Sequence, residues 1–336
     1  MTTIYLIRHG EAEGNAFRRT HGQYDSILTP NGFRQLPYLE ERFRDIHVDA
    51  CYSSDLTRTS LTARSVYVPK GLKLNRDPAF REIGMGVWED CTFGYLEQFE
   101  PEQMYNFSKN PACWHAEGAE TLDQWTGRFI AGLKRVAEAH TDGTVTVFCH
   151  GGILRTTLMR LFFEDDLSKV PYCDNTAVSK LFWDGERFSY EYLNDSSHVP
   201  QELSTFARQK WWREGTNINY NMWFKPLESC PEGFPVPEPQ WVSFVAMLGQ
   251  VPVGILSLDK DAGAIAMAYL LPDYQGKTLE DQFLGQAVSY IRRWGFSTMK
   301  AVRQRMEPQE VLDRYGFTQE GEYWQRNVDP KVYSWD

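Results

Sequence analysis

The chain has 336 residues, of which 42% are hydrophobic and 14% aromatic, and its formal net charge is -10. Its length exceeds the size at which single cores usually stop growing, so we expect more than one domain. The acidic balance argues against nucleic acid and anionic membranes as partners, and no run approaches the roughly 18 apolar residues of a membrane span.

The first predicted element is a short buried strand, Ile4–Ile7, which ends in Arg8, His9 and Gly10. Four consecutive apolar residues, two of them β-branched, suit a strand that is covered on both faces. Ligands bind beyond the carboxyl ends of such strands, so we expect Arg8 and His9 at a ligand crevice. A turn at Gly10 would let both side chains reach one ligand. The pair predicts an anion site that contains a nucleophile.

Further segments follow in chain order: Glu11 and Asn15, His21–Gln35 (HGQYDSILTPNGFRQ), Tyr52–Ala63 (YSSDLTRTSLTA), Phe80–Asp90 (FREIGMGVWED) and Val145–Leu158 (VTVFCHGGILRTTL). The last segment is a second apolar strand that delivers His150 into a Gly-Gly turn and a helix. This ordered series resembles the histidine phosphatase superfamily. The resemblance implies a doubly wound, mostly parallel α/β sheet of the phosphoglycerate-mutase-like type over residues 1–198.

The resemblance also implies a role for each matching residue. His9 is the nucleophile that becomes phosphohistidine, and it must be neutral to attack. Arg8 and Arg58 form a guanidinium clamp on the phosphate. His150 donates to the transferring phosphoryl group, and the turn at Gly151 lets the backbone approach closely at a helix N-terminus.

Two assignments have alternatives. Asn15 stands where the family places a polar phosphate contact, and a turn-forming role is the other interpretation. Glu82 matches the family segment that carries a proton-donating carboxylate. Its apolar and glycine neighbours suggest a partly desolvated pocket, which suits a general acid and base. Glu11 and Glu89 are the alternatives for this role, although we expect Glu11 to orient its loop and Glu89 to cap or pair.

These assignments predict a metal-independent phosphatase that hydrolyses a small phosphorylated metabolite without a cofactor, because arginines neutralise the charge. The segment GAETLDQWTGRF resembles the alpha-ribazole phosphatase and broad-specificity phosphatase branch. The segment from Cys91 to about Leu122 is expected to lie over the pocket. Its single lysine, Lys109, and its lack of arginine disfavour the alternative of a phosphoglycerate mutase. Its aromatic residues either select the substrate or pack a cap core: Tyr95, Phe99, Tyr105, Phe107 and Trp114.

Residues 199–240 are predicted to form an aromatic and proline-rich connector. Its aromatic cluster is either a domain interface or part of a site: Trp211, Trp212, Tyr220 and Trp223. Beyond it the pattern predicts strands at about 242–248, 251–258 and 264–271, a helix at 278–295, a strand at 299–304, a short helix and a final strand. This order resembles the GNAT acetyltransferase superfamily and implies a smaller α+β domain over residues 241–336.

The GNAT-like part departs from that family's pattern at the loop that binds coenzyme A. The loop begins at Gln275, but Thr278 and Glu280 stand at its two small-residue positions. Leu312 stands where a tyrosine often acts as general acid, and Tyr315 falls at a packing position. We therefore expect a degenerate domain that shapes the site, forms a homodimer or binds a regulator. Acetyl transfer or acyl-CoA binding is the alternative function.

The cysteines show no Cys-x-x-Cys pairing and are expected to be reduced thiols: Cys51, Cys91, Cys113, Cys149, Cys173 and Cys230. The four-residue apolar start is too short for a signal peptide. We therefore expect a cytoplasmic protein.

Overall fold

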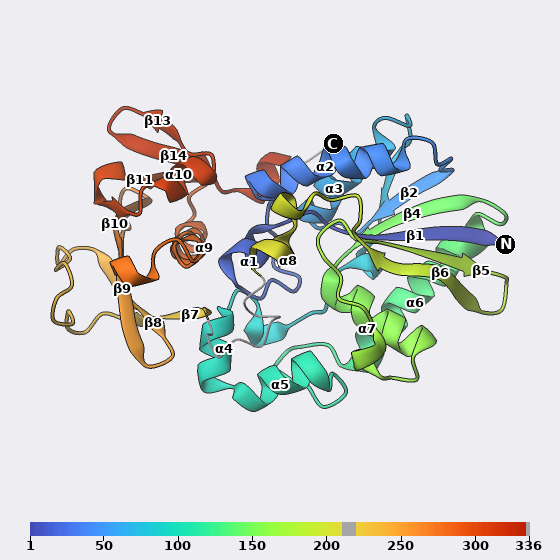
Figure 1. The fold of residues 1–336 in the computed structure, drawn as a ribbon, viewed down its shortest axis with the longest axis horizontal. Coiled ribbons are helices and arrows are strands. Elements are labelled where there is room, and N and C mark those ends of the chain that lie inside the picture. Colours follow the sequence, from blue (N-terminus) through green and yellow to red (C-terminus); the bar gives the residue numbers. More distant parts are fainter. Residues whose placement is uncertain (210–219, 334–336) are drawn as a thin grey trace.

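The computed structural model describes residues 1–209 and 220–333. Within these residues the strands form two sheets, which lie in two neighbouring domains (Figure 1). The first sheet has the order β3-β2-β4-β1-β5-β6. Its strands are β1 (Thr2–Arg8), β2 (Ala50–Ser53), β3 (Leu74–Arg76), β4 (Thr144–Cys149), β5 (Val178–Trp183) and β6 (Phe188–Asp195). β1 to β4 are parallel, and β5 and β6 extend the sheet antiparallel, which confirms the predicted mostly parallel α/β sheet.

The helices of the first domain are α1 (Glu13–Phe17), α2 (Pro30–Phe43), α3 (Thr57–Tyr67), α4 (Phe93–Phe99), α5 (Pro101–Lys109), α6 (Leu122–Ala139), α7 (Gly151–Phe162) and α8 (Thr205–Arg208). Their starts follow local capping rules. Thr29 caps α2 ahead of a proline in its first turn, and Thr121 and Gln124 cap α6 reciprocally. Among the helices described for the chain, none is long and apolar enough to cross a bilayer.

Alternate side chains of β1 enter two different cores. Ile4 and Leu6 pack with the apolar residues of α6 and α7, whereas Tyr5 and Ile7 pack with those of α2 and α3. Figure 1 shows these two helix layers on opposite faces of the sheet. Because successive strand side chains point to opposite faces, a strand covered on both faces needs consecutive apolar residues. The doubly wound architecture follows from this pattern.

The second sheet has the order β13-β14-β11-β10-β9-β8-β7, and β12 pairs with β10. Its strands are β7 (Met222–Pro226), β8 (Val242–Leu248), β9 (Val251–Asp259), β10 (Ala264–Leu270), β11 (Thr298–Ala301), β12 (Met306–Glu307), β13 (Thr318–Glu320) and β14 (Tyr323–Asn327). Its helices are α9 (Glu280–Arg293) and α10 (Glu310–Arg314). A second domain that contains a sheet is therefore present, and its GNAT-like character stays a prediction.

The region predicted as a connector contributes to both domains. β7 pairs with β8, so part of residues 199–240 is a strand of the second sheet and not a linker. Trp223 of β7 is buried, and its indole N–H donates to the carbonyl oxygen of Gly249 at 2.8 Å. This contact makes it a packing residue. Trp211 and Trp212 lie outside the described residues.

α1 lies between the two domains (Figure 1). Although it directly follows the first strand of the first domain, Ala16 and Phe17 belong to the hydrophobic core of the second. α9 approaches α1 closely at Gly285, where a Cβ atom would lie 2.5 Å from the Cβ of Phe17. The ring of Phe17 also packs against Tyr315 with centroids 5.2 Å apart. One short helix is thus shared by the two domains.

Candidate active site

β1 and β4 end side by side and bring two histidines together. The two strands are parallel neighbours whose register pairs Arg8 with Cys149, so His9 and His150 follow at the same edge of the sheet. Both side chains are buried, and their ring centroids lie 5.2 Å apart. The structure therefore places the two predicted histidines in one site although they are far apart in sequence.

Hydrogen bonds fix which nitrogen of each imidazole carries the proton. Nδ1 of His9 lies 2.7 Å from the carbonyl oxygen of Gly10, which can only accept, so Nε2 of His9 keeps its lone pair. Nδ1 of His150 accepts from Nε of Arg58 at 3.2 Å, so the proton of the neutral His150 ring lies on Nε2. That Nε2 is buried without a hydrogen-bond partner among the described residues. The pair therefore presents a nucleophilic nitrogen and an unused N–H donor.

Burial and nearby cations keep both imidazoles neutral. Burial lowers the pKa of His9 well below its ordinary value, and the charges of Arg58 and Arg8 lower it further. The pKa of His150 is also well below its ordinary value, first through burial and then through Arg58 and His9. These shifts keep a lone pair available on Nε2 of His9.

Arg8 and Arg58 are held by backbone carbonyl oxygens. Nη1 of Arg8 donates to Cys173. Nη1 of Arg58 donates to Tyr24 at 2.9 Å and its Nη2 donates to Gly22 at 2.7 Å. Arg58 lies in the first turn of α3 and is only 2% exposed. These acceptors are neutral and orient both guanidinium groups toward an anion. The carboxylates of Asp25, Glu82 and Glu89 also act on the charge of Arg58.

Glu82 binds the start of α7 and faces the same cavity as His9. Its Oε2 accepts from the backbone N–H of Gly152 at 3.0 Å, and its Oε1 accepts from Ile153 at 2.6 Å and from Ile83 at 3.1 Å. The sequence suggested apolar surroundings for this carboxyl group. The structure corrects this expectation, because the first turn of a helix has unpaired N–H groups that bind an anion.

The two glycines at the start of α7 make room for charged side chains. A Cβ atom at Gly151 would lie 2.8 Å from Nε of Arg8, and one at Gly152 would lie 3.0 Å from Oε1 of Glu82. Gly151 itself lines the cavity. The Gly-Gly turn therefore lets a cation and a carboxylate pack against one helix end.

Asn15 lines the cavity from α1, while its oxygen serves the local fold. Oδ1 accepts from the backbone N–H of Ala12 at 3.0 Å and from Nδ2 of Asn175 at 3.1 Å. Both interpretations of Asn15 therefore have support. Asn175, which the sequence analysis missed, also donates to the carbonyl oxygen of His9 at 3.0 Å. It lies in an irregular loop where no pattern marks it.

The two alternative carboxylates are engaged elsewhere. Glu11 is buried and accepts from the side chains of Thr29, Asn31 and Thr205. Glu89 accepts from the backbone N–H groups of Gln23 and Met85. Neither is among the described residues that line the cavity of His9. These contacts agree with the orienting and capping roles expected from the sequence.

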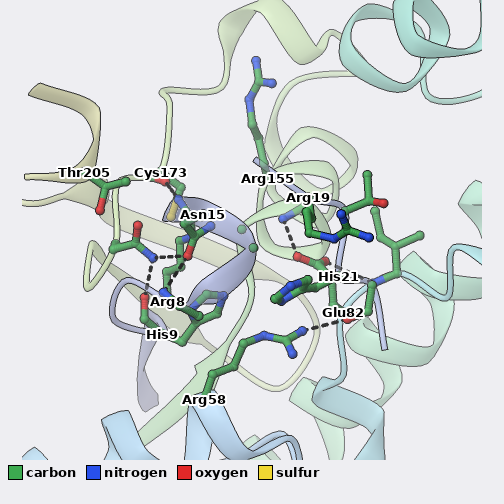
Figure 2. Close-up of a pocket in the computed structure, with 18 of the residues that line it drawn as sticks. Arg8, His9, Asn15, Arg19, His21, Arg58, Glu82, Arg155, Cys173 and Thr205 are labelled. Atoms are coloured by element: carbon green, nitrogen blue, oxygen red, sulfur yellow. Dashed lines mark hydrogen bonds between the residues drawn. The ribbon is translucent and has the colours of Figure 1, made fainter. Parts of the chain in front are cut away.

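The site opens into a cavity of about 280 Å³ (Figure 2). Its walls include further polar groups that the sequence analysis did not single out: Arg18, Arg19, His21, Arg155 and Tyr172. Figure 2 shows His21 beside Glu82 and Arg58. The pKa of His21 is well below its ordinary value, through burial first and then through Arg58. A single loop histidine has no signal in sequence, so only the fold reveals it.

The predicted cap segment divides between core and cavity. Trp114 is buried and packs edge-on against Trp88 with ring centroids 5.4 Å apart. Phe107 lines the cavity instead. Tyr95 and Phe99 are partly exposed, and Phe99 packs against Trp223 of the second domain at 5.0 Å. The packing interpretation therefore holds for Trp114, whereas selection of the substrate by Phe107 stays a prediction.

The first turn of α9, where the GNAT pattern would bind coenzyme A, contains two carboxylates. Glu280 and Asp281 are buried there, and both form ion pairs with Arg314, at 3.2 Å and 2.6 Å. Burial raises the pKa of Asp281 to about 7, although Arg314 opposes this shift. An acyl-CoA pyrophosphate at this helix start would meet like charge. The geometry thus offers no support for the alternative function.

Comparisons with known proteins identify the family of the first domain. Residues 4–196 match the model of the histidine phosphatase superfamily, branch 1. Phosphoserine phosphatase 1 of Hydrogenobacter thermophilus is 29% identical over 201 residues, which are 59% of this chain and 95% of that protein. Phosphoglycerate mutase-like protein 4 of Arabidopsis thaliana is 30% identical over 203 residues, which are 59% of this chain and 87% of that protein.

A solved structure agrees with these relatives. Bacillus stearothermophilus YhfR matches with a TM-score of 0.56 and 29% identity, over 60% of this chain and 100% of its own. The family match takes in more than half of the chain, including His9, Arg58, Glu82 and His150, and it ends before the second domain. Through its N-terminal domain, the chain belongs to the histidine phosphatase superfamily, branch 1.

Proposed function

We propose that this protein is a phosphatase that hydrolyses small phosphate monoesters through a phosphohistidine intermediate on His9. The observation that carries the proposal is that the two imidazoles hold their protons on different ring nitrogens. His9 offers a free Nε2 lone pair and His150 offers an unused Nε2–H, beside two guanidinium groups. Family membership and a relative named as a phosphoserine phosphatase support hydrolysis.

The reaction would proceed in two displacements. In the first, Nε2 of His9 attacks phosphorus and the bond to the leaving oxygen breaks, while protonated Glu82 gives that oxygen its proton. Arg8, Arg58 and the N–H of His150 stabilise the charge on the phosphoryl oxygens. In the second, Glu82 takes a proton from the water that attacks phosphohistidine, which frees inorganic phosphate and restores His9. The amide of Asn15 and the backbone at Gly151 would contact the same phosphate.

A labelling experiment tests this intermediate. During turnover of a ³²P-labelled monoester, rapid quenching should trap label on the protein that survives alkali and is lost in acid. Turnover should persist in excess EDTA, because arginines supply the positive charge. Steady release of phosphate without labelled protein would contradict the proposal. Transfer of the phosphoryl group to a second hydroxyl without phosphate release would favour the mutase alternative.

The role of Glu82 predicts a dependence on the leaving group. Glu82→Gln should slow alkyl phosphates by roughly 10²-fold or more but 4-nitrophenyl phosphate much less, because nitrophenolate leaves without a proton. The measurement is kcat for a series of monoesters of graded leaving-group pKa. Glu89→Gln, outside the cavity, is the matched control. Equal slowing across the series would argue against the acid role.

Because the pKa values of His9 and His150 are lowered, we expect the protein to stay active at pH values below 6.5. A histidine whose pKa is lowered stays neutral below its ordinary value near 6.5, so protonation should not inactivate His9 until the pH falls well below that value. Values of kcat/KM for 4-nitrophenyl phosphate between pH 4 and pH 8 measure how the activity falls as the pH is lowered. If the activity instead halves at about pH 6.5 because His9 becomes protonated, the pKa of His9 is not lowered and its imidazole is exposed to water.

We also infer that the second domain shapes the site through Arg19, which follows α1. Arg19 of the cavity wall donates to Asp90 at 2.8 Å and to Gln286 of α9 at 2.9 Å. Ser289 of α9 donates to the same Asp90. Because these groups are buried, the second domain fixes the position of a residue that faces the phosphate cavity. A homodimer or a regulator at this domain stays an open alternative.

A further inference from the structure

A second cavity, of about 320 Å³, continues from the phosphate site along α7. The two cavities share part of their walls, namely Ile83, Phe107, Gly152, Arg155 and Tyr172. Figure 2 shows the side chain of Arg155 extending away from His9 and Arg58. We call this second cavity the outer cavity. Because the two cavities share these walls, a leaving group attached to a phosphate at His9 would lie next to the outer cavity.

Arg155 is held in the same way as the two clamp arginines. Its Nη2 donates to the backbone carbonyl oxygen of Leu167 at 3.2 Å, and its guanidinium group lies over the ring of Tyr172 at 4.5 Å. Burial lowers its pKa, and the groups that oppose this shift are Tyr172 and Cys173, not a carboxylate. By contrast, Arg160 on the same helix pairs with two aspartates at the surface. Arg155 therefore keeps its charge for a ligand, as Arg8 and Arg58 do.

The outer cavity is basic although the protein is acidic. The chain has a net charge of -10, yet the described residues that line this cavity include Arg155 and Lys109 and no aspartate or glutamate. Phe107, Trp125 and Tyr172 add aromatic surface to the same walls. Two cations with no carboxylate among the described lining residues, beside aromatic rings, suit an anion that is joined to an apolar or planar group.

We propose that the substrate carries a second anionic group on its leaving alcohol, and that this group binds Arg155 and Lys109 in the outer cavity. The anion is a carboxylate or a second phosphate, and the portion between the two ends packs against Phe107 and Tyr172. The proposal rests on the proposed function, because the reacting phosphate must occupy the site at His9. The cap segment alone, with Lys109 as its single lysine and no arginine, does not indicate this subsite, since the second cation comes from α7.

Three matched substrates test the subsite. They are phenyl phosphates whose para alkyl chain ends in a carboxylate, a phosphonate or a neutral carboxamide, so that the reacting centre stays the same. The protein should favour one or both anionic ends over the carboxamide by about 10-fold or more in kcat/KM. The end that is preferred identifies the anion.

Two variants at Arg155 separate charge from structure. Arg155→Gln keeps a donor for the carbonyl of Leu167 but loses the charge, so the preference for anionic ends should disappear. Arg155→Lys should restore part of it, and Lys109→Gln should reduce it. Arg160→Gln, on the same helix but outside both cavities, is the control and should keep the preference.

The outcomes distinguish this proposal from the proposed function. Equal kcat/KM for the three substrates, or an equal loss for all three in Arg155→Gln, would overturn the subsite and leave Arg155 a structural residue. 4-Nitrophenyl phosphate reports on the reacting centre alone. If its hydrolysis depends on His9 while the anionic ends give no advantage, the subsite fails and the phosphatase assignment stands.

Discussion

Replacing His9 with alanine should lower kcat/KM for 4-nitrophenyl phosphate on the order of 10⁴-fold or more. The reason is that Nε2 of His9 is the free lone pair of the histidine pair, because Nδ1 of His150 accepts from Arg58. The variant should also take up no ³²P label, because the proposed covalent intermediate forms on Nε2 of His9. The measurement is steady-state nitrophenol release together with the quenched labelling experiment.

His47→Ala is the matched control for this variant. The side chain of His47 is 82% exposed, contacts Asp49 at 2.9 Å, and is not among the described residues that line the cavity. Its removal should leave turnover within about two-fold, as for most surface substitutions. Activity in His9→Ala comparable with that of His47→Ala would remove His9 as the nucleophile. Far-ultraviolet circular dichroism checks that both variants are folded.

Replacing Arg292 with methionine should destabilise the protein by about 2–4 kcal/mol. Arg292 of α9 pairs at 2.9 Å with Glu13 of α1, whose side chain is only 1% exposed. Removing one partner leaves a buried carboxylate whose remaining cation, Arg326, lies 3.6 Å away. The free energy of unfolding in urea measures the loss. Because α1 carries Asn15 and leads to Arg19, the activity of the folded fraction should fall as well.

The neighbouring residue supplies the control. Arg293 also reaches across to the first domain, where it pairs with Asp90 at 3.1 Å, but its side chain is 58% exposed. Water screens such a pair, and Asp90 keeps Arg19 and Ser289, so Arg293→Met should cost less than about 1 kcal/mol. A double-mutant cycle with Glu13→Gln would isolate the coupling between Glu13 and Arg292. Equal losses in the two arginine variants would show that this buried pair does not join the domains.

The sequence alone determined the parts of this protein that depend on local order along the chain. Consecutive apolar residues specify β1 and β4 as strands buried on both faces, and these strands end in His9 and His150. Residues 4–196 carry enough ordered motifs to assign the superfamily, and the strands predicted at 242–248, 251–258 and 264–271 formed within a residue of those limits. These features need only the spacing of residue types.

Only the tertiary structure decided the contacts between segments that are distant in sequence. The carboxylate of Glu82 lies on the first turn of α7 and not in apolar surroundings, and Arg155 meets Tyr172 beside a second cavity. Phe17 enters the core of the other domain, and β7 completes its sheet from within a region that seemed a connector by composition. The physical reason is that burial, hydrogen-bond partners and local charge are set by which strands pair and which helices pack, and one residue's neighbours in sequence do not reveal them.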